Sequence, residues 1–521
     1  MIKKINAKEV KNWVSDNKEI SFIDVREIGQ HTKGHPFFSI SIPYSIFEIR
    51  LLELVPNKHV RIVLFDNNNG IAILAAKHAK LMGYNNISIL ENGIEGWLNA
   101  GFKLFDGINV PSKSFGELVE HKYNTPSITP NNLFKKQQQK EDIIILDGRP
   151  LDEYNKMSIP GSICCPNAEI PYRISSFVKN DDTQIIVNCA GRTRSIIGAQ
   201  ALINFGIKNK VYALENGTQG WFLSNLKLEN GKKNYLNLEP HLKEKKKLNL
   251  KIRILLNENK IEIIDIKKVK DLIDNKGRST FFFNVTTENI YKDDISFIKN
   301  VAGGQLVQAT DNFIGVLKSQ IILIDDGDLV RSGITALWLK KFNFDCYVLD
   351  VKHEEIIKLK FKNDTKYTDI PVEKITLDEF KNMKDIFIFD VRNSIEFCKA
   401  RLKKSIWLNR ANLDNYNNLT KKKIVLVNDD FNKTQLIYKD LNNKFPEKTI
   451  AVYSWNEKDF DRFPQYFDKD EIQMNKDFID FNFHTYLRHQ GNREHSIQYL
   501  KWETNLLNKM DKDEKGFFKY F

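Results

Sequence analysis

A pattern of short apolar strands recurs four times along the chain, and no other feature of the sequence limits its fold as strongly. In each copy, a first strand ending near an acidic residue or an asparagine is followed about 40 residues later by a second apolar strand and then by a helical pattern. Strands that alternate with helices predict βαβ units, in which helices cover both faces of a buried parallel sheet. The first strands lie at 21–26, 144–149, 282–286 and 386–392, and the second strands at 61–65, 184–188, 321–324 and 424–428.

Each copy closes with a third short strand. The closing segments at 90–97 and 214–221 are nearly identical, whereas those at 347–350 and 452–455 are weaker. The uneven spacing of the copies favours separate domains over a solenoid. The predicted fold is therefore an α/β chain of four tandem units, each a mainly parallel sheet flanked by helices. The units span 1–108, 125–230, 252–355 and 370–468, with linkers at 106–130, 230–249 and 360–371.

The segment 469–521 does not share the repeat. Several of its apolar side chains lie at near-helical spacing, namely Ile497, Leu500, Leu506, Leu507 and Met510. This spacing predicts a C-terminal helical extension with an amphipathic helix that packs on one of the domains. Partner binding is the alternative use of such a helix.

Composition and cysteine usage indicate a globular protein of a reducing compartment. The 521 residues are 41% hydrophobic and 28% charged, with a formal net charge of +12. This charge favours anionic partners in general, but it is a weak signal, and Lys-rich solvated surfaces are the preferred explanation for it. Five cysteines form neither a disulfide framework nor a zinc-type pair, so we expect a cytoplasmic protein without a metal site. No apolar stretch reaches the roughly 18 residues of a membrane span, and the N-terminus has no apolar signal segment.

The second unit carries a cysteine in a setting that suits nucleophilic chemistry. Cys189 directly follows the apolar strand 184–188, and a helical pattern begins a few residues later. Backbone N–H groups of a curled loop and the helix dipole favour a thiolate, which is the reactive form of cysteine. Gly191 gives the loop conformations closed to other residues, and Arg192 and Arg194 add positive charge that could bind an oxyanion. No metal or organic cofactor is needed. The alternative is an inert core cysteine.

Several segments of the second unit together resemble the rhodanese superfamily. They are the loop 189–195, the strand end Asp147-Gly148-Arg149, the segment 159–162 and the closing Gly220-Trp221. Through the linker 109–117 and the tail 499–503, the whole chain resembles bacterial multidomain rhodanese proteins with four tandem units. The resemblance implies that sulfane sulfur passes through a cysteine persulfide to a thiophilic acceptor. It assigns catalysis to Cys189, Arg192, Arg194, Asp147 and Arg149, and substrate binding to the loop residues Ala190, Gly191, Thr193 and Ser195.

The length of the loop distinguishes this chain from the related dual-specificity phosphatases of the cell cycle. Four residues separate Cys189 from Arg194, and those phosphatases resemble rhodaneses but have about one residue more. The shorter loop should suit a sulfur atom better than a phosphate group. Beside the loop, Asp147 and Arg149 are expected to form an ion pair. Arg149 either contacts substrate or is purely structural, and Glu153 is a weaker candidate at the same edge.

The other three units lack the nucleophile. Aspartates stand at the matching position, and a carboxylate cannot form a persulfide, so these units are predicted to be inactive scaffolding or to have a binding role of their own. Cys164 and Cys165 are interpreted as core residues, with a resolving thiol as the alternative. Cys346 and Cys398 are interpreted as structural. The aspartates are Asp66, Asp325 and Asp429.

The leading hypothesis is an enzyme that takes sulfur from a small anionic donor. Thiosulfate fits the arginine-rich loop better than 3-mercaptopyruvate does, because a dianion gains more from two positive charges. The acceptor is a thiol or a protein. The alternative, from another functional class, is a persulfide carrier or scaffold protein with little small-molecule turnover. Nucleic-acid binding would depend on net charge alone and is not expected, and no membrane partner is expected.

Overall fold

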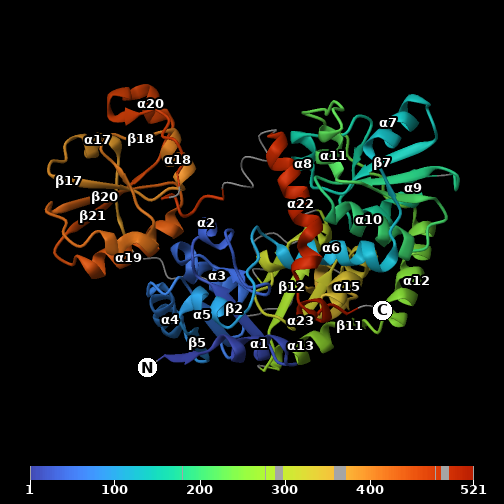
Figure 1. The fold of residues 1–521 in the computed structure, drawn as a ribbon, viewed down its shortest axis with the longest axis horizontal. Coiled ribbons are helices and arrows are strands. Elements are labelled where there is room, and N and C mark those ends of the chain that lie inside the picture. The colour runs from blue at the N-terminus through green and yellow to red at the C-terminus, as the bar shows by residue number, and fades with distance from the viewer. Residues whose placement is uncertain are drawn as a thin grey trace.

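Four five-stranded parallel sheets follow one another along the chain, as the repeat predicts (Figure 1). The computed structural model describes residues 2–519 except 179, 276, 288–296, 352, 357–370, 476 and 483–491. All strand pairs within the four sheets are parallel. In unit one, for example, β5 pairs in parallel with β1 on one side and with β4 on the other. A separate antiparallel pair joins β18 (Arg401–Leu402) to β22 (Phe467–Asp468).

The four sheets share one strand order. In unit one it is β1-β5-β4-β2-β3, and units two and three repeat it, while unit four ends on β19. The strands of units one and two are β1 (Lys3–Ile5), β2 (Ile20–Asp24), β3 (Ile40–Ser41), β4 (Arg61–Phe65), β5 (Ile87–Leu90), β6 (Ser127–Ile128), β7 (Ile143–Asp147), β8 (Ile163–Cys164), β9 (Gln184–Asn188) and β10 (Val211–Leu214). Those of units three and four are β11 (Glu262–Ile264), β12 (Thr280–Asn284), β13 (Ile298–Asn300), β14 (Gln320–Ile324), β15 (Asp345–Leu349), β16 (Glu373–Ile375), β17 (Ile386–Asp390), β19 (Ile406–Trp407), β20 (Lys423–Asn428) and β21 (Thr449–Ser454).

Helices cover the sheets, which explains why the central strands are apolar on both faces. In β9, for example, Ile185, Ile186 and Val187 are all fully buried. The helices of units one and two are α1 (Ala7–Ser15), α2 (Ile28–His31), α3 (Phe47–Leu54), α4 (Ile71–Leu81), α5 (Gly93–Asn99), α7 (Pro130–Gln138), α8 (Leu151–Lys156), α9 (Ile170–Phe177), α10 (Thr193–Asn204) and α11 (Gly217–Leu223). Those of units three and four are α12 (Leu242–Glu258), α13 (Ile266–Asp274), α14 (Gly303–Gln308), α15 (Val330–Lys341), α16 (His353–Ile356), α17 (Leu377–Lys381), α18 (Ser394–Lys399), α19 (Phe431–Lys444) and α20 (Lys458–Arg462).

Two of the predicted linkers contain helices. The segment 106–130 includes α6 (Val110–Tyr123), which starts with Pro111 in its first turn, where the missing N–H costs nothing. Phe115 and Val119 of α6 are buried. Helix α12 begins inside the segment 230–249, because Leu248 and the apolar residues one and two turns later supply a buried face. Almost all of the third linker, 360–371, lies outside the described residues.

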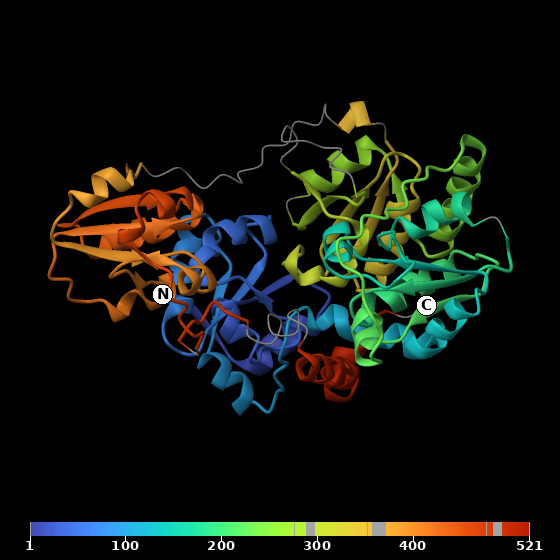
Figure 2. The same cartoon turned by 90° about the horizontal axis from the view of Figure 1, so that it is seen from above.

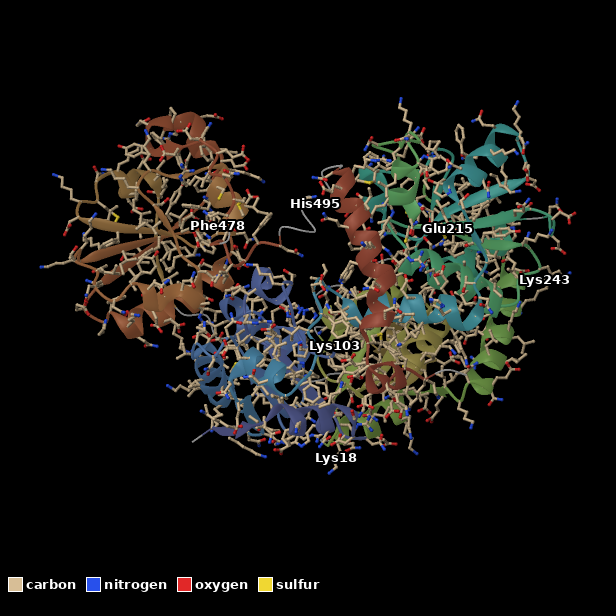
Figure 3. All side chains as sticks on the ribbon, in the orientation of Figure 1. Lys18, Lys103, Glu215, Lys243, Phe478 and His495 are labelled. Carbon is tan, nitrogen blue, oxygen red and sulfur yellow. The ribbon has the colours of Figure 1, made fainter. Side chains whose placement is uncertain are left out.

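The predicted amphipathic helix of the tail is confirmed as α22 (Arg493–Lys509), which is followed by α23 (Lys512–Gly516). Leu500, Leu506 and Met510 are buried, and Ile497 is half-exposed. Helix α22 packs against α6 and α11, and Figures 1 and 2 both place it beside α6. The first part of the extension, 469–482, is not helical over its described residues. In Figure 3 Phe478 lies with unit four and His495 lies in the first turn of α22.

The units are not packed to the same degree. One large buried apolar cluster runs through units one, two and three and includes Leu506 and Phe518 of the tail. Unit four has apolar clusters of its own. Its contact with unit one includes the fully buried Arg410, which bonds to Glu48 at 2.5 and 2.8 Å. Units one to three and the tail therefore form one packed body. Unit four is attached to it through polar contacts such as that of Arg410 with Glu48, and through Ala411, which packs against the large cluster. Among the described helices, none has the length and apolar character needed to cross a bilayer.

Candidate active site

Cys189 lies in a tight turn between β9 and α10. The chain leaves the buried strand at Asn188, and α10 begins four residues after the cysteine, at Thr193. The carbonyls of the turn are held by the N-terminus of α11: Thr218 N–H donates to Cys189 O at 2.8 Å, and Gln219 N–H donates to Ala190 O at 3.1 Å. The closing segment that the first two units share therefore positions the loop.

The sulfur of Cys189 lies where a negative charge is stabilised. The residue is 2% exposed, and the Ser195 hydroxyl donates a hydrogen bond to Sγ at 3.1 Å. Ser195 is in the first turn of α10, so the positive end of the helix dipole also faces the sulfur. Ser195 was predicted to bind substrate; in the structure its hydroxyl instead donates to the sulfur of Cys189.

The units without the cysteine show which side chains this loop geometry accommodates. In unit three, the Asp325 carboxylate occupies the position of the cysteine and accepts hydrogen bonds from the N–H groups of Gly327, Leu329 and Ser332 and from the Ser332 hydroxyl. In unit one, the Asp66 carboxylate accepts from two backbone N–H groups in the same way. A side-chain anion is thus stabilised at the strand end in both units, which supports a thiolate at the same place in unit two.

Asp147 and Arg149 form the expected ion pair. The Arg149 guanidinium donates to the Asp147 carboxylate at 2.8 and 2.7 Å, and to the Met157 carbonyl at 2.6 Å. The same arrangement recurs at Arg26 and Arg392 in units that lack the nucleophile. The pair is therefore part of the architecture of a unit. Arg149 additionally lines the cavity at Cys189, whereas Asp147 is fully buried behind it.

The two loop arginines have different surroundings. Arg192 was predicted to bind an oxyanion, but its guanidinium turns to α6 and pairs with Glu117, at 2.7 and 2.9 Å, and with Glu120. It does not line the cavity. Arg194 does, and it bonds to Glu153 at 2.8 and 2.7 Å. Burial alone would raise the pKa of Glu153, but the guanidinium lowers it to about 2.

The reason predicted for Gly191, a backbone conformation closed to other residues, is wrong. The φ of Gly191 lies outside the left-handed region, so the loop does not need glycine for its conformation. A Cβ at this position would instead lie 3.2 Å from Glu503 Oε2 and 3.5 Å from Gln219 Nε2. The absence of a side chain allows the tail helix to approach the loop closely.

A cavity of about 850 Å³ opens in front of Cys189. Its walls come from four parts of the chain: unit one with the following segment 106–109, unit two, unit three at Gln308, and the tail at Tyr499 and Trp502. Ala190 and Gly191 line it, whereas Thr193 and Ser195 do not. The exposed side chains of Lys33 and Lys156 lie at its edge. The cavity is within the size range of sites for small organic molecules.

Two helices outside unit two contribute residues that the sequence analysis missed. Lys113 of α6 lines the cavity with a 12% exposed side chain. Its ammonium lies 3.5 Å from the Glu503 carboxylate of α22, which also accepts a hydrogen bond from Thr193 Oγ1 at 2.8 Å. Tyr499 and Trp502 form the adjacent wall. The signal was available, because segments 109–117 and 499–503 carried the resemblance to multidomain rhodaneses, but they are distant in the sequence from the loop.

The remaining cysteines are core residues. All four are buried and free, and Cys164 Sγ donates to the Arg149 carbonyl at 3.3 Å. Burial raises the pKa of Cys164 to about 12 and that of Cys165 well above its ordinary range, so neither supplies a thiolate at neutral pH. This favours core packing over a resolving thiol.

One acidic cluster has the composition of a metal site. Side-chain oxygens of Asp325, Asp326 and Asp328 lie within 4.8 Å of one another. However, the Arg331 guanidinium lies among them, bonding to Asp328 at 2.6 Å and to Asp326. The positive charge that these carboxylates need is therefore supplied by a side chain.

Comparisons with known proteins agree with this geometry. A family model described as "Rhodanese-like domain" matches residues 6–100 and 131–224. A putative sulfur carrier protein, YrkF of Bacillus subtilis, is 31% identical over 102 residues; the match covers 20% of this chain and about half, 54%, of that protein. The crystal structure of a thiosulfate sulfurtransferase from Pseudomonas aeruginosa is 28% identical, with a TM-score of 0.89, and the match covers 100% of this chain and 99% of that one.

Proposed function

Because this chain belongs to the rhodanese superfamily, as four tandem rhodanese-like units, we propose that it is a sulfurtransferase that moves sulfane sulfur from thiosulfate to a thiophilic acceptor through a persulfide on Cys189. The likeness over the full chain to a thiosulfate sulfurtransferase carries this proposal. The position of Cys189, in an anion-stabilising loop that faces a cavity, supports it.

The reaction takes two displacements. The Cys189 thiolate attacks the outer sulfur of thiosulfate; a new S–S bond forms, and the S–S bond of the donor breaks with its electron pair leaving on sulfite. An acceptor nucleophile, such as a thiolate or cyanide, then attacks the outer sulfur of the persulfide and returns Cys189 as a thiolate. Neither step needs an oxidant or a metal. The negative charge passes from the Cys189 sulfur to the outer sulfur of the persulfide, and it returns to the Cys189 sulfur when the acceptor removes that outer sulfur. The Ser195 hydroxyl and the dipole of α10 stabilise the charge while it is on Cys189.

The surrounding charges select an anionic donor. Arg149 and Arg194 line the cavity, and Lys33 and Lys156 at its edge are exposed and have no ion pair among the described residues. This cationic entrance attracts dianions such as thiosulfate and raises their local concentration. In this proposal Arg194 contacts the donor from the loop, and the ion pair with Asp147 fixes the position of Arg149.

The test is the release of thiocyanate from thiosulfate and cyanide. Wild-type protein should turn over, and Cys189→Ser should not, since serine cannot form a persulfide under these conditions. Mass spectrometry of protein incubated with thiosulfate alone should find one added sulfur atom on the peptide that contains Cys189. Turnover that survives in Cys189→Ser would remove the proposal.

A persulfide carrier is the second candidate, favoured by the likeness of one unit to a putative sulfur carrier protein. In that role Cys189 would accept sulfur from a partner protein and pass it on by docking. The 2% exposure of Cys189 and the cavity walls supplied by the tail and by units one and three disfavour direct attack by a protein thiol. Wild-type protein without thiosulfate turnover, but with a persulfide that a sulfur-loaded partner installs on Cys189, would favour the carrier.

We place this activity in the cytoplasm or another reducing compartment. The five cysteines are all free, and the reaction itself requires a reduced Cys189. A low-molecular-weight thiol of that compartment is the proposed acceptor.

A further inference from the structure

Each arginine near the nucleophile already has a carboxylate partner. Arg149 is paired with Asp147, and Arg194 is paired with Glu153 through two short hydrogen bonds. Arg192 faces away, toward Glu117. These carboxylates accept hydrogen bonds from most of the guanidinium N–H groups that would otherwise reach a dianionic donor. Arg194 Nε has no hydrogen-bond partner among the described residues, so this arginine leaves one N–H donor at the cavity. The other oxygens of a sulfonate group need a second cation with available donors.

Lys113 is a cation of this kind. Its ammonium has three N–H donors, and it makes no side-chain hydrogen bond to any residue in the part of the chain that the structure describes. The Glu503 carboxylate is 3.5 Å away, too far for a strong bond, and Glu503 already accepts from the Thr193 hydroxyl. Because the side chain is only 12% exposed, water cannot fully replace the missing partners.

The location of Lys113 directs these donors toward the reaction. It lines the same cavity as Cys189 and Arg194, and its ammonium lies 5.9 Å from the centroid of the Tyr499 ring. Burial alone would lower the pKa of Lys113, but the Glu503 carboxylate, and to a smaller extent a charged Cys189, raise it above its ordinary range. The side chain is therefore an ammonium at neutral pH.

We infer that Lys113 is a further catalytic residue, which binds the sulfonate oxygens of the donor and stabilises sulfite as it leaves. This inference rests on the proposed function. When the Cys189 thiolate attacks the outer sulfur, the electron pair of the breaking S–S bond moves onto the sulfonate sulfur. Lys113 supplies positive charge at the sulfonate end of the donor, while the Ser195 hydroxyl and the dipole of α10 stabilise charge on the attacking sulfur of Cys189. The second displacement, on the persulfide, has no sulfonate group and does not need Lys113.

The two half-reactions can be measured separately. Lys113→Met should reduce kcat/KM for persulfide formation from thiosulfate by about ten- to a hundredfold, the loss expected for hydrogen bonds to a charged group. It should leave the discharge of a preformed persulfide to cyanide within about twofold of wild type, a difference too small to represent a lost charged hydrogen bond. Inhibition by sulfite should weaken in parallel, and Lys113→Arg should recover part of the activity. Lys122→Met, at the exposed end of the same helix, is the matched control and should behave as wild type.

Loss of the ammonium leaves Glu503 buried without a cation, which could unfold the site. The double variant Lys113→Met/Glu503→Gln removes that charge, and it should fold and still lose persulfide formation selectively. An equal loss in both half-reactions, or unchanged kcat/KM for thiosulfate, would overturn the inference. Those outcomes differ from failure of the proposed function, in which wild-type protein itself would form no persulfide on Cys189.

Discussion

Gly217 lies at the point where α11 meets the nucleophile loop, and its replacement by alanine should disable the site. Its φ is +53°, and a Cβ would lie 2.2 Å from the Cys189 carbonyl oxygen and 2.8 Å from the Gly191 carbonyl oxygen. These neighbours are backbone atoms, so they cannot rotate out of the way. The substitution must move the loop away from α11.

The destabilisation expected for Gly217→Ala follows from the backbone strain it introduces and the hydrogen bonds it breaks. An L-residue in the left-handed region costs about 1–2 kcal/mol. Separation of the loop from α11 also breaks the hydrogen bonds from Thr218 N–H and Gln219 N–H, at about 0.5–1.5 kcal/mol each. The expected destabilisation is about 2–5 kcal/mol. Since a displacement of about 1 Å can cost about a hundredfold in rate, thiocyanate formation should fall by at least that factor.

Unit one supplies the matched control. Gly93 has the same φ of +53°, and its Cβ would lie 2.3 Å from the Asp66 carbonyl oxygen, in a loop without a nucleophile. Gly93→Ala should therefore cost similar stability in chemical denaturation and leave the kcat of folded protein near wild type. Equal activity losses in the two variants, or a Gly217→Ala protein that is destabilised but fully active, would refute the reasoning that the loop is held in place by α11.

Three further predictions concern charge and cysteine reactivity. Ser195→Ala, which removes the hydrogen bond to Cys189 Sγ, should slow persulfide formation by about tenfold with an unchanged circular dichroism spectrum; an unchanged rate would exclude the role given to that hydroxyl. Burial alone would raise the pKa of Glu48, but Arg410 lowers it to about 2. The ion pair of Glu48 with Arg410 therefore contributes fully to stability above pH 4.5, the pKa of Glu48 in the unfolded chain, and this contribution is lost as the pH falls toward 2. Limited proteolysis should cleave between unit four and unit one in wild-type protein below pH 4.5, and in Arg410→Met already at neutral pH. Equal resistance of wild type and Arg410→Met at all pH values would contradict this. Iodoacetamide should label Cys189 in the native protein and spare Cys164, whose pKa burial raises to about 12, as peptide mass mapping would establish; rapid labelling of Cys164 would be the contrary result.

The fold was predictable because it depends on local patterns. The apolar strands of each unit matched β2, β4 and their counterparts to within one or two residues, since a strand covered on both faces must be apolar throughout. The short edge strands, such as β1 and β6, were missed because two or three residues carry too little pattern. Helix α6 was missed for another reason: its segment, 106–130, was predicted to be a linker, although Pro111 lies in the first turn of a helix there.

The site was predictable only where it is continuous in sequence. Cys189 directly follows a strand and precedes a helix in the sequence, so its position in the fold was predictable. The ion pair of Asp147 with Arg149 was predictable for the same reason, because the two residues are two positions apart. The direction of a side chain is set by its partners in space, so the sequence did not reveal that Arg192 turns to Glu117 on another helix. For the same reason Lys113 and Glu503 escaped notice, because their meeting depends on how α22 packs against α6.

The hydrogen bond from Thr193 to Glu503 joins residues 310 positions apart, which has a consequence for synthesis. A ribosome adds about 5–20 residues per second, so on the order of 15–60 s pass between the two codons. During that interval the Cys189 loop exists without Tyr499 and Trp502, the tail residues that form one wall of the cavity in the complete chain. The nascent protein therefore carries an accessible thiol before it has an enclosed cavity. Sulfur transfer with the selectivity of the finished enzyme begins only when α22 has left the ribosome and docked.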